Sequence, residues 1–475
     1  MRPLRLAALG SAAVVLAGCV VGPAYRTPPL PGGAAAPLVS VDSAAETAAR
    51  LQDDWWRLYN DPRLDGLITE AFAANADLSA AEANLSGARA ILEASQAGRY
   101  PSTTALAGAV HGRDAATDQI LEIVGHKPES IWKYDTLFSV AYEVDLFGRV
   151  RRSIEASRAD AEAVAAARDG LKVTVAAETA RAYAQICTLG EQIDVARHAL
   201  QLVSRSSEIT TQRRLAGANS EFDEVRTQAL VAQVRATLPP LESQRRAALF
   251  QLTALLGRTP SRAPAEVEAC VAPPRLSALM PVGDGAALLK RRPDVRQAER
   301  RLAAATARIG VATADLYPHV SLTGLYGGVG SRLSYLSAER GLTWGVGPSV
   351  SWSFPIQAAP RARVRQARAG ADAALAVFDA VVLQALNETE QALAVYGAEL
   401  DRRRSLADAH DLALRAFELA NGQFLAGSLS QLELLVSEQA LVASDTAAAA
   451  SDAAIAQDQV AVFKALGGGW RSPPK

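Results

Sequence analysis

Strict alternation of apolar and polar residues is the clearest local pattern in this chain. Every even position from 342 to 356 is apolar, proline included, and the odd positions up to residue 353 are threonine, glycine or serine. A period of two over this length predicts a β-strand with one apolar and one polar face. The same alternation covers residues 136–146 and, with more glycine, residues 318–328, while residues 102–111 show it most weakly. We therefore expect four strands in two pairs.

Two long stretches that follow the strand pairs have the composition of helices. Residues 148–238 and 361–470 contain no proline and are rich in Ala, Glu, Gln, Arg and Leu, which favour helix. Residues 149–214 as a single helix would extend about 100 Å at 1.5 Å per residue. Each stretch is expected to form a helical hairpin that turns at a glycine near its middle, Gly217 or Gly427.

The chain contains the same unit twice, at an offset of 210 residues. The matched positions are Glu178-Thr179 with Glu388-Thr389, Gly217 with Gly427, and Leu256-Gly257 with Leu466-Gly467. A duplication of this length predicts two similar units packed side by side. The copies differ on the returning helix, where Pro239-Pro240 should break or kink the first copy and Ala449-Ala450 should leave the second one straight.

The N-terminus has the pattern of an export signal. Two arginines precede the apolar run Leu6–Val15, and Leu16-Ala-Gly-Cys19 follows. The run is shorter than the roughly 20 residues that a membrane helix needs, so residues 1–18 are predicted to be a signal peptide. Small residues before Cys19 form a bacterial lipoprotein box, which predicts a diacylglycerol and an N-acyl chain on Cys19; the alternative is an ordinary signal peptide with a chance cysteine. Val20, in place of an aspartate, favours the outer membrane, facing the periplasm.

Composition narrows the class of protein further. Apolar residues make up 49% of the chain, largely as alanine, and aromatic residues only 5%, which is typical of long helices packed closely together. Loss of the two leader arginines takes the net charge from −1 to about −3, so no basic surplus indicates nucleic acid as a partner. In an oxidising periplasm Cys187 and Cys270 could form a disulfide, or they could remain two unpaired, buried thiols.

The strands are long enough to cross a bilayer when tilted. Membrane strands need about 9–11 residues, and Tyr142, Trp344 and Trp352 could lie in aromatic girdles; the alternative is a half-buried sheet in a soluble protein. Four strands cannot close a barrel, and an open edge in lipid is energetically forbidden. Several chains must therefore share their strands, and a trimer would supply twelve. The expected fold is an internally duplicated α+β membrane protein, with a trimeric 12-stranded β-barrel continued by a long periplasmic helical barrel.

Signals of catalysis are few. The five histidines are scattered, and the chain has no His-Glu-x-x-His, no cysteine pair at metal-binding spacing and no Gly-x-Ser-x-Gly. We expect no enzyme activity, no metal and no cofactor other than the covalent lipid.

Several short motifs in order along the chain carry a family resemblance. They are Cys19-Val-Val-Gly22-Pro23-Ala-Tyr25, Trp55-Trp56 with Asp61-Pro62-Arg-Leu64, Tyr142-Glu143-Val-Asp145-Leu-Phe147-Gly148-Arg149, Arg292-Pro293-Asp294-Val295-Arg296 with Glu299-Arg300, Ala314-Asp315-Leu316-Tyr317-Pro318, and Leu466-Gly-Gly-Gly-Trp470. With them the chain resembles the outer-membrane efflux lipoproteins of the TolC superfamily, in the branch of nodulation-type and drug-efflux factors. The resemblance runs from Cys19 to Trp470.

The resemblance implies a homotrimeric exit duct in the outer membrane of a Gram-negative bacterium. It implies that the duct receives small molecules such as drugs from an inner-membrane RND-type pump through a periplasmic adaptor. Alternatives are the exit duct of an ABC-type (type I) secretion system or of a metal efflux system, and, third, a structural lipoprotein that forms no channel. The sequence names neither the substrate nor the pump, because a passive duct inherits specificity from its pump.

The resemblance also places a gate near the helix turns. Asp223 and Glu433, each six residues after a turn glycine, match acidic positions of the family and match each other at the repeat offset. Three copies of such carboxylates in a narrow pore would favour cations; the alternative is a solvated carboxylate at a helix start. Phe424 stands where some relatives carry a latch tyrosine and Leu429 where some carry an arginine, so the bonding of a closed gate is left open.

These patterns divide the chain into consecutive parts. They are a signal peptide (1–18), a lipid-anchored segment with the first helices (19–100), a first outer-membrane β-hairpin (101–147), a first periplasmic helical hairpin (148–257), an inter-repeat link and helix (258–317), a second β-hairpin (318–356), a second helical hairpin (357–470) and a tail (471–475).

Overall fold

The computed structural model divides the chain into two compact units. It describes residues 20–41, 46–47, 52–113, 115–125, 127, 130–276, 279–283 and 285–468. The first unit combines residues 1–28, 85–164 and 298–378, and the second combines residues 29–84, 165–297 and 379–475. Each unit thus contains residues from both copies of the duplicated segment.

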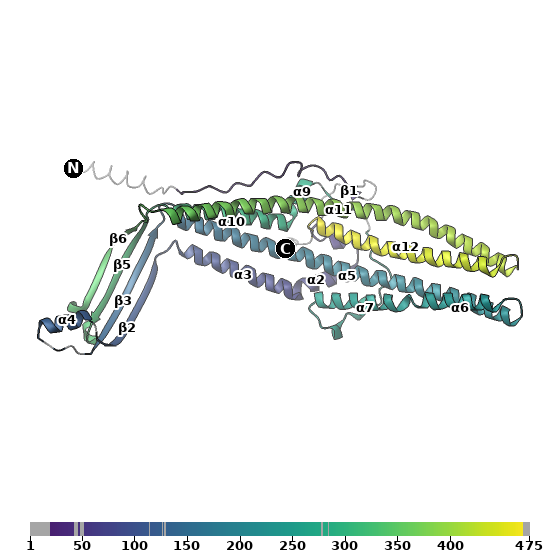
Figure 1. Cartoon of the computed structure of the whole chain (residues 1–475), viewed down its shortest axis with the longest axis horizontal. Helices are drawn as coiled ribbons and strands as arrows, with labels where there is room; N and C mark the ends of the chain where they lie inside the picture. The colour runs from purple at the N-terminus through teal and green to yellow at the C-terminus, as the bar shows by residue number, and fades with distance from the viewer. Residues whose placement is uncertain are drawn as a thin grey trace. The chain divides into compact units, whose positions relative to one another are not determined.

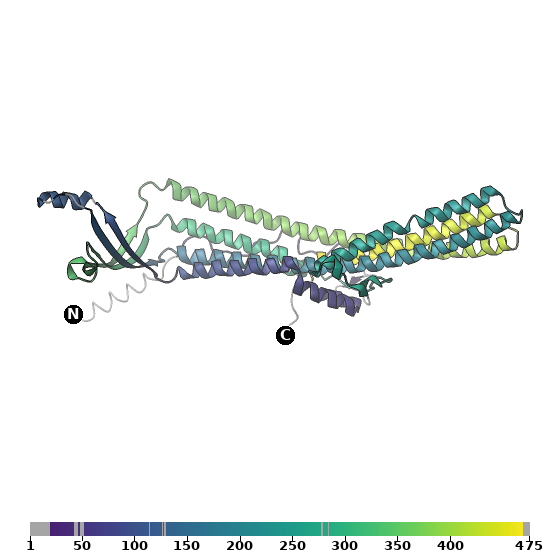
Figure 2. The same ribbon diagram turned by 90° about the horizontal axis from the view of Figure 1, so that it is seen from below.

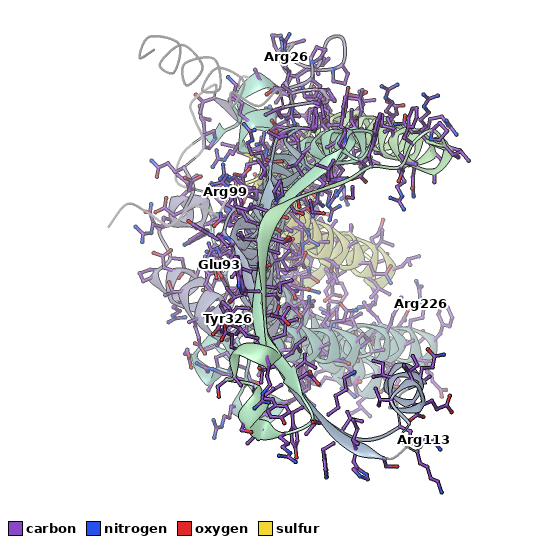
Figure 3. All side chains as sticks on the ribbon, turned by 90° about the vertical axis from the view of Figure 1, so that its left-hand side faces the viewer. Arg26, Glu93, Arg99, Arg113, Arg226 and Tyr326 are labelled. Atoms are coloured by element: carbon purple, nitrogen blue, oxygen red, sulfur yellow. A yellow bond between two sulfur atoms is a disulfide. The ribbon has the colours of Figure 1, made fainter. Side chains whose placement is uncertain are left out.

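A four-stranded antiparallel sheet is the main feature of the first unit (Figure 1). Its strands are β2 (Ser102–Gly112), β3 (Ile131–Val144), β5 (His319–Gly330) and β6 (Leu342–Ser351), in the order β2-β3-β5-β6. Helix α4 (Ala115–Ile123) lies in the connection between β2 and β3. The strands bend along their length, with Tyr326 on β5 and Arg113 just beyond the end of β2 (Figure 3).

The register of the sheet gathers the large apolar side chains on one face. Trp344 lies opposite Tyr326, Tyr326 opposite Phe138, and Phe138 opposite Ala105. Residues that lie opposite each other in an antiparallel pair share a face. The three aromatic side chains are 48–70% exposed in the single chain. On this face β2 presents Thr103, three alanines and His111, while Leu106 lies on the other, which is why residues 102–111 alternate so weakly.

The last strand is shorter than its sequence pattern indicates. We expected it to run to residue 356, but β6 ends at Ser351, which pairs with His319 at the start of β5. Beyond that point β5 has no residue left to pair with, and Pro355, which follows a cis peptide bond, has no N–H to donate. The Trp352 indole donates instead to the carbonyl of Leu316, 3.1 Å away.

The chain forms two helical hairpins, whose long helices begin in the first unit and which otherwise belong to the second (Figure 2). The first comprises α5 (Arg149–Leu215), α6 (Glu221–Arg235) and α7 (Leu238–Leu255), and the second α11 (Ala358–Leu425) and α12 (Gln431–Ala465). The predicted break is confirmed, because α6 stops before Pro239-Pro240 and α7 starts with them in its first turn. The predicted continuity of α12 through Ala449-Ala450 is confirmed as well. Leu230 of α6 and Leu435 of α12 share one buried cluster with α5, so the two hairpins pack against each other.

Within the described residues, the remaining elements are two short strands, four 3-10 helices and five helices of at most 22 residues. They are β1 (Glu46–Thr47), η1 (Trp55–Tyr59), α2 (Pro62–Ala74), α3 (Ala76–Ala97), η2 (Pro260–Arg262), α8 (Ala265–Glu268), β4 (Met280–Pro281), α9 (Gly285–Arg291), α10 (Pro293–Ala314), η3 (Leu333–Tyr335) and η4 (Glu339–Gly341). Strands β1 and β4 pair in parallel.

The main core of the second unit is built around the tryptophan motif. Trp55 is fully buried and stacks on Phe463 of α12, with ring centroids 4.5 Å apart. The Tyr183 hydroxyl of α5 donates to Asp61 Oδ2 at 2.7 Å, and Asp61 in turn caps the start of α2. The Trp55-Trp56 and Asp61-Pro62 motifs therefore join the N-terminal helices to the hairpins.

Candidate functional site

Both helical hairpins turn on a glycine in the left-handed conformation. Gly217 has φ +76° and Gly427 has φ +78°, values that side chains with a Cβ rarely adopt. After each glycine the next amide reaches back across the turn, from Ala218 to the Arg213 carbonyl at 2.8 Å and from Ser428 to the Gln423 carbonyl at 2.9 Å. This is the Schellman pattern, so both copies close their long helix in the same way.

The two acidic residues singled out by sequence begin the returning helices. Asp223 Oδ2 accepts from the Ser220 hydroxyl at 2.7 Å and from the Ser220 amide at 3.1 Å, while the Asp223 amide donates to the Ser220 hydroxyl. Glu433 forms the same capping box with Ser430, at 2.7 and 3.0 Å. Hydrogen bonds from the Ser430 side chain and backbone lower the pKa of Glu433. Each carboxylate thus has a structural task at the turn, and its role in a gate stays a prediction.

A cation–aromatic contact joins α5 to α11 beside the turns. The Arg213 guanidinium lies 4.0 Å from the centroid of the Phe424 ring, which is 4% exposed. Next to it, Arg214 pairs with Glu224 of α6, and Thr211 donates to the same carboxylate at 3.0 Å. The sequence identified Phe424 only as a departure from a tyrosine. Its partner Arg213 was missed, because the two residues are distant in the chain and no local pattern links them.

The segment that follows the lipoprotein box lies against the end of β3. The Val21 amide donates to the Phe147 carbonyl at 3.2 Å, and a Cβ on Gly148 would come within 2.7 Å of Val20 Cγ1. The Tyr25 hydroxyl donates to Glu299 Oε1 at 2.9 Å. Cys19 itself is outside the described residues, but its neighbour Val20 is held at the end of the sheet from which α5 departs.

A disulfide joins Cys187 of α5 to Cys270 in the link between the two copies, with the Cα atoms 4.8 Å apart. The link approaches α5 closely here, because a Cβ on Gly190 would come within 2.2 Å of the Cys270 carbonyl oxygen. That oxygen also accepts from Arg245 at 2.6 Å. Among the described residues, no group of three or more His, Cys, Asp or Glu side chains could hold a metal ion.

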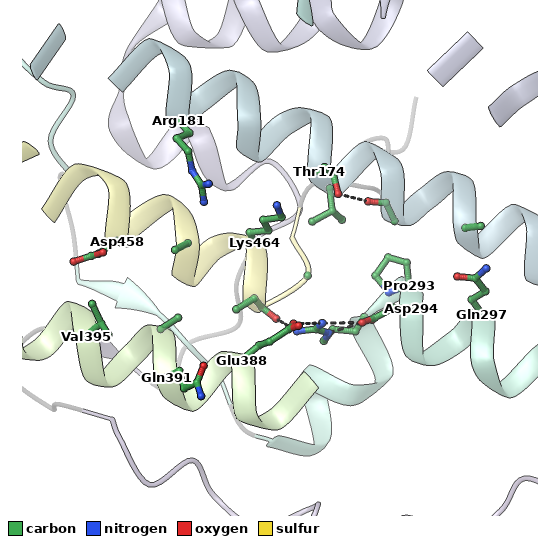
Figure 4. Close-up of a pocket in the computed structure, with 18 residues that line it drawn as sticks. Thr174, Arg181, Pro293, Asp294, Gln297, Glu388, Gln391, Val395, Asp458 and Lys464 are labelled. Carbon is green, nitrogen blue, oxygen red and sulfur yellow. Dashed lines mark hydrogen bonds and ion pairs between the residues drawn. The ribbon is translucent and has the colours of Figure 1, made fainter. Parts of the chain in front are cut away.

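Arg292 organises a cavity of about 670 Å³ between α5, α10, α11 and α12. Its guanidinium donates to the Ala465 carbonyl at the end of α12 at 2.8 Å, and to Asp294 and Glu388 at 2.7 Å each. Glu388 and Asp294 approach each other from different elements (Figure 4). Arg292 is 7% exposed, and it belongs to a motif that the sequence singled out without indicating its partners.

The comparisons with known proteins agree with this geometry. A sequence model of outer membrane efflux proteins matches residues 67–258 and 286–468, which cover both copies. The chain is 27% identical to the probable outer membrane lipoprotein SilC of Salmonella typhimurium, over 96% of this chain and 97% of SilC. It is 28% identical to the toluene efflux pump outer membrane protein TtgF of Pseudomonas putida, over 96% of this chain and 95% of TtgF.

A solved structure of the outer-membrane channel OprN superposes on the chain with a TM-score of 0.87. The two are 35% identical, and the match covers 95% of this chain and 100% of OprN. The similarity therefore extends over the sheet and both helical hairpins.

Proposed function

The chain belongs to the outer membrane efflux protein family, and on that premise we propose that it is the outer-membrane exit duct of a tripartite efflux system. The observation that carries the proposal is the sheet of the first unit, whose apolar face exposes large side chains such as Phe138, Tyr326 and Trp344, while the long helices follow its strands in the chain. An apolar face of this size on a single soluble chain would be a liability. In a Gram-negative outer membrane it faces lipid. The family is one of efflux channels, and we assign the chain no catalytic activity.

We propose a homotrimer that closes a 12-stranded barrel. Within the described residues β2 and β6 each pair with a single strand, so both edges of the sheet are open. Since β2 and β6 run in opposite directions, β6 of one chain can pair antiparallel with β2 of the next. Three such junctions would leave no edge exposed to lipid, as a membrane barrel requires.

The lipid anchor is proposed at Cys19. SilC is named as a probable lipoprotein, and this chain carries the box at the expected place. The packing of Val20 on Gly148 at the end of β3 would put an acylated Cys19 next to the proposed barrel. The acyl chains and the barrel would then enter the same membrane.

The partners are proposed to be a periplasmic adaptor and an inner-membrane RND-type pump. TtgF is named as part of a toluene efflux pump, which favours small molecules over secreted proteins as cargo. The turns at Gly217 and Gly427 lie at the far ends of α5 and α11 from the strands, so they are the parts that would meet these partners.

A photo-crosslinking residue at Ala218 or Ser428 in living cells would test this assignment. Both positions are exposed in the turns, and we expect each to capture an adaptor and an RND pump. The control is the exposed Ser337, between β5 and β6, which we expect to face outward and to capture no periplasmic protein. An ABC exporter at the turns would move the function to secretion, and a monomer without periplasmic partners would overturn the duct.

A further inference from the structure

A second cavity lies near the helix turns, between α5, α11 and α12. Its volume is about 290 Å³, at the lower end of the range for small-molecule pockets. The residues that matter for its chemistry are Arg205, Ser206, Phe417, Asn421, Phe424 and Glu438. All three helices belong here to the second unit, so the cavity is a feature of one compact body.

Glu438 is a buried carboxyl group without a cationic partner among the described residues. It is 1% exposed, and the Ser206 hydroxyl of α5 is its hydrogen-bonding neighbour. That hydroxyl lowers the pKa of Glu438, but it carries no charge, and the opposing effect of burial is larger. Burial raises the pKa of Glu438 from 4.5 to about 7. A carboxylate left unpaired in such a place is costly, and an arriving positive charge would remove most of that cost.

The residues that line the cavity supply no buried positive charge to Glu438, which leaves a ligand to supply it. Arg205 of α5 is the other charged residue that lines the cavity, and its side chain is exposed to solvent. The lining residues of α11 are aromatic, aliphatic or amide side chains, and α12 adds only Leu434 beside Glu438. The cavity therefore holds one acid and no buried base.

The duplication shows that the helices do not need an acid at this position. The equivalent residue in the first copy, 210 positions earlier, is Gln228 of α6. It is exposed, and its amide donates to Glu224 at 3.3 Å. A glutamine thus occupies the same helix position in the first copy. Forming the helix therefore does not require the acid that the second copy has there.

The walls of the cavity complement an organic cation. Phe417 and Phe424 both line it, and aromatic faces attract cations. The Phe424 ring already accepts the Arg213 guanidinium at 4.0 Å. The Asn421 side chain adds an amide that can accept a hydrogen bond.

We propose that this cavity binds a small organic cation, an ammonium group on an aromatic or aliphatic body. The ammonium would pair with the Glu438 carboxylate and donate to Asn421, and the apolar body would lie against Phe417 and Phe424. The ligand would thereby link α12 to α11. It would also contact Phe424, the ring that Arg213 contacts. The inference concerns binding to the purified chain and does not depend on transport.

The test uses the full-length purified protein and benzylammonium as the probe, with affinity measured by calorimetry. We expect Glu438→Gln, which keeps the shape and removes the charge, to weaken binding about tenfold or more. Glu418→Gln is the matched control, because it removes an exposed carboxylate of α11 that does not line the cavity, and it should leave the affinity unchanged. The neutral analogue benzyl alcohol should bind more weakly than the cation.

The wild-type protein provides a second readout that needs no variant. The probe stays protonated on both sides of neutrality, whereas Glu438 loses its proton as the pH rises through about 7. Affinity should therefore increase with pH across that range and level off above it. Equal affinities of wild type and Glu438→Gln, a flat pH profile, or no binding of benzylammonium would overturn the proposal.

Discussion

At two positions in the chain a serine and an acidic residue three places later form the same reciprocal pair. Ser220 with Asp223 and Ser430 with Glu433 each satisfy two backbone amides at a helix start. The sequence left two interpretations open, a pore-lining gate or a carboxylate at a helix N-terminus. The structure shows that the second is compatible with the first, because each carboxylate caps its helix and is still at least partly exposed at the turn.

Replacing both acids should therefore change the ion selectivity of the channel and also weaken the helix caps at the turns. We expect Asp223→Ala with Glu433→Ala to lose most of a cation preference in planar bilayer recordings, because a ring of carboxylates focuses the potential in a constriction. The control is Ser220→Ala with Ser430→Ala, which weakens each cap by about 1 kcal/mol but keeps the carboxylates. Cation preference that survives in the acid variant would show that these residues do not line the pore.

At the scale of elements, the duplication is seen again in two places where the end of one helix is bonded to the start of another. We call these two places joints. In the first copy the Asn75 amide donates to the Leu255 carbonyl at the end of α7, at 3.2 Å. In the second, Arg292 donates to the Ala465 carbonyl at the end of α12. A helix of 22 residues thus begins where another helix ends, α3 after α7 and α10 after α12. The second joint uses a charged network in place of a neutral amide.

Arg292→Ala should destabilise the protein by about 2–4 kcal/mol, because it removes a buried guanidinium that caps α12 and pairs with two acids. Denaturant unfolding of the purified protein measures this change. Lys464→Ala is the comparison, since its ion pair with Glu178 is partly exposed and should be worth less than about 1 kcal/mol. Similar losses for both variants would mean that the joint does not depend on Arg292.

At the scale of the whole molecule, the central feature is a sheet that one chain cannot complete. Its apolar face is exposed, and its two outer strands have free edges within the described residues. Both features disfavour a soluble monomer, because open edges and apolar faces promote association. A barrel of three chains in a membrane would pair the open edges and cover the apolar face with lipid.

Neighbouring positions on β6 provide a matched test of the barrel. Val346 lies on the apolar face and is 74% exposed in the single chain, while Gly347 lies on the opposite face with free space for a side chain. Val346→Lys should impair membrane assembly by up to about 2–4 kcal/mol, and Gly347→Lys should be tolerated. The readout is the amount of heat-resistant trimer in outer-membrane fractions. In a soluble sheet neither lysine would matter, so equal yields would contradict the barrel.

The local features of the fold could be read from the sequence because each depends on a few adjacent residues. Period-two alternation predicted β6, and Pro239-Pro240 predicted the break between α6 and α7. The error at the end of β6 shows the limit of such patterns. Apolar alternation continues to residue 356, but a strand ends where its neighbour does, and the end of β5 is a property of the pairing.

By itself, the sequence determined the duplication, the order of strands and helices, the turn glycines and the resemblance to a family, because these follow from periodicity, backbone preference and short motifs. Only the tertiary structure decided which distant side chains meet. It placed Arg213 against Phe424, brought Arg292 to an acceptor 173 residues away, and buried Glu438 in a cavity between α5, α11 and α12. These contacts depend on how long helices pack across one another, and packing places residues together that share no local pattern.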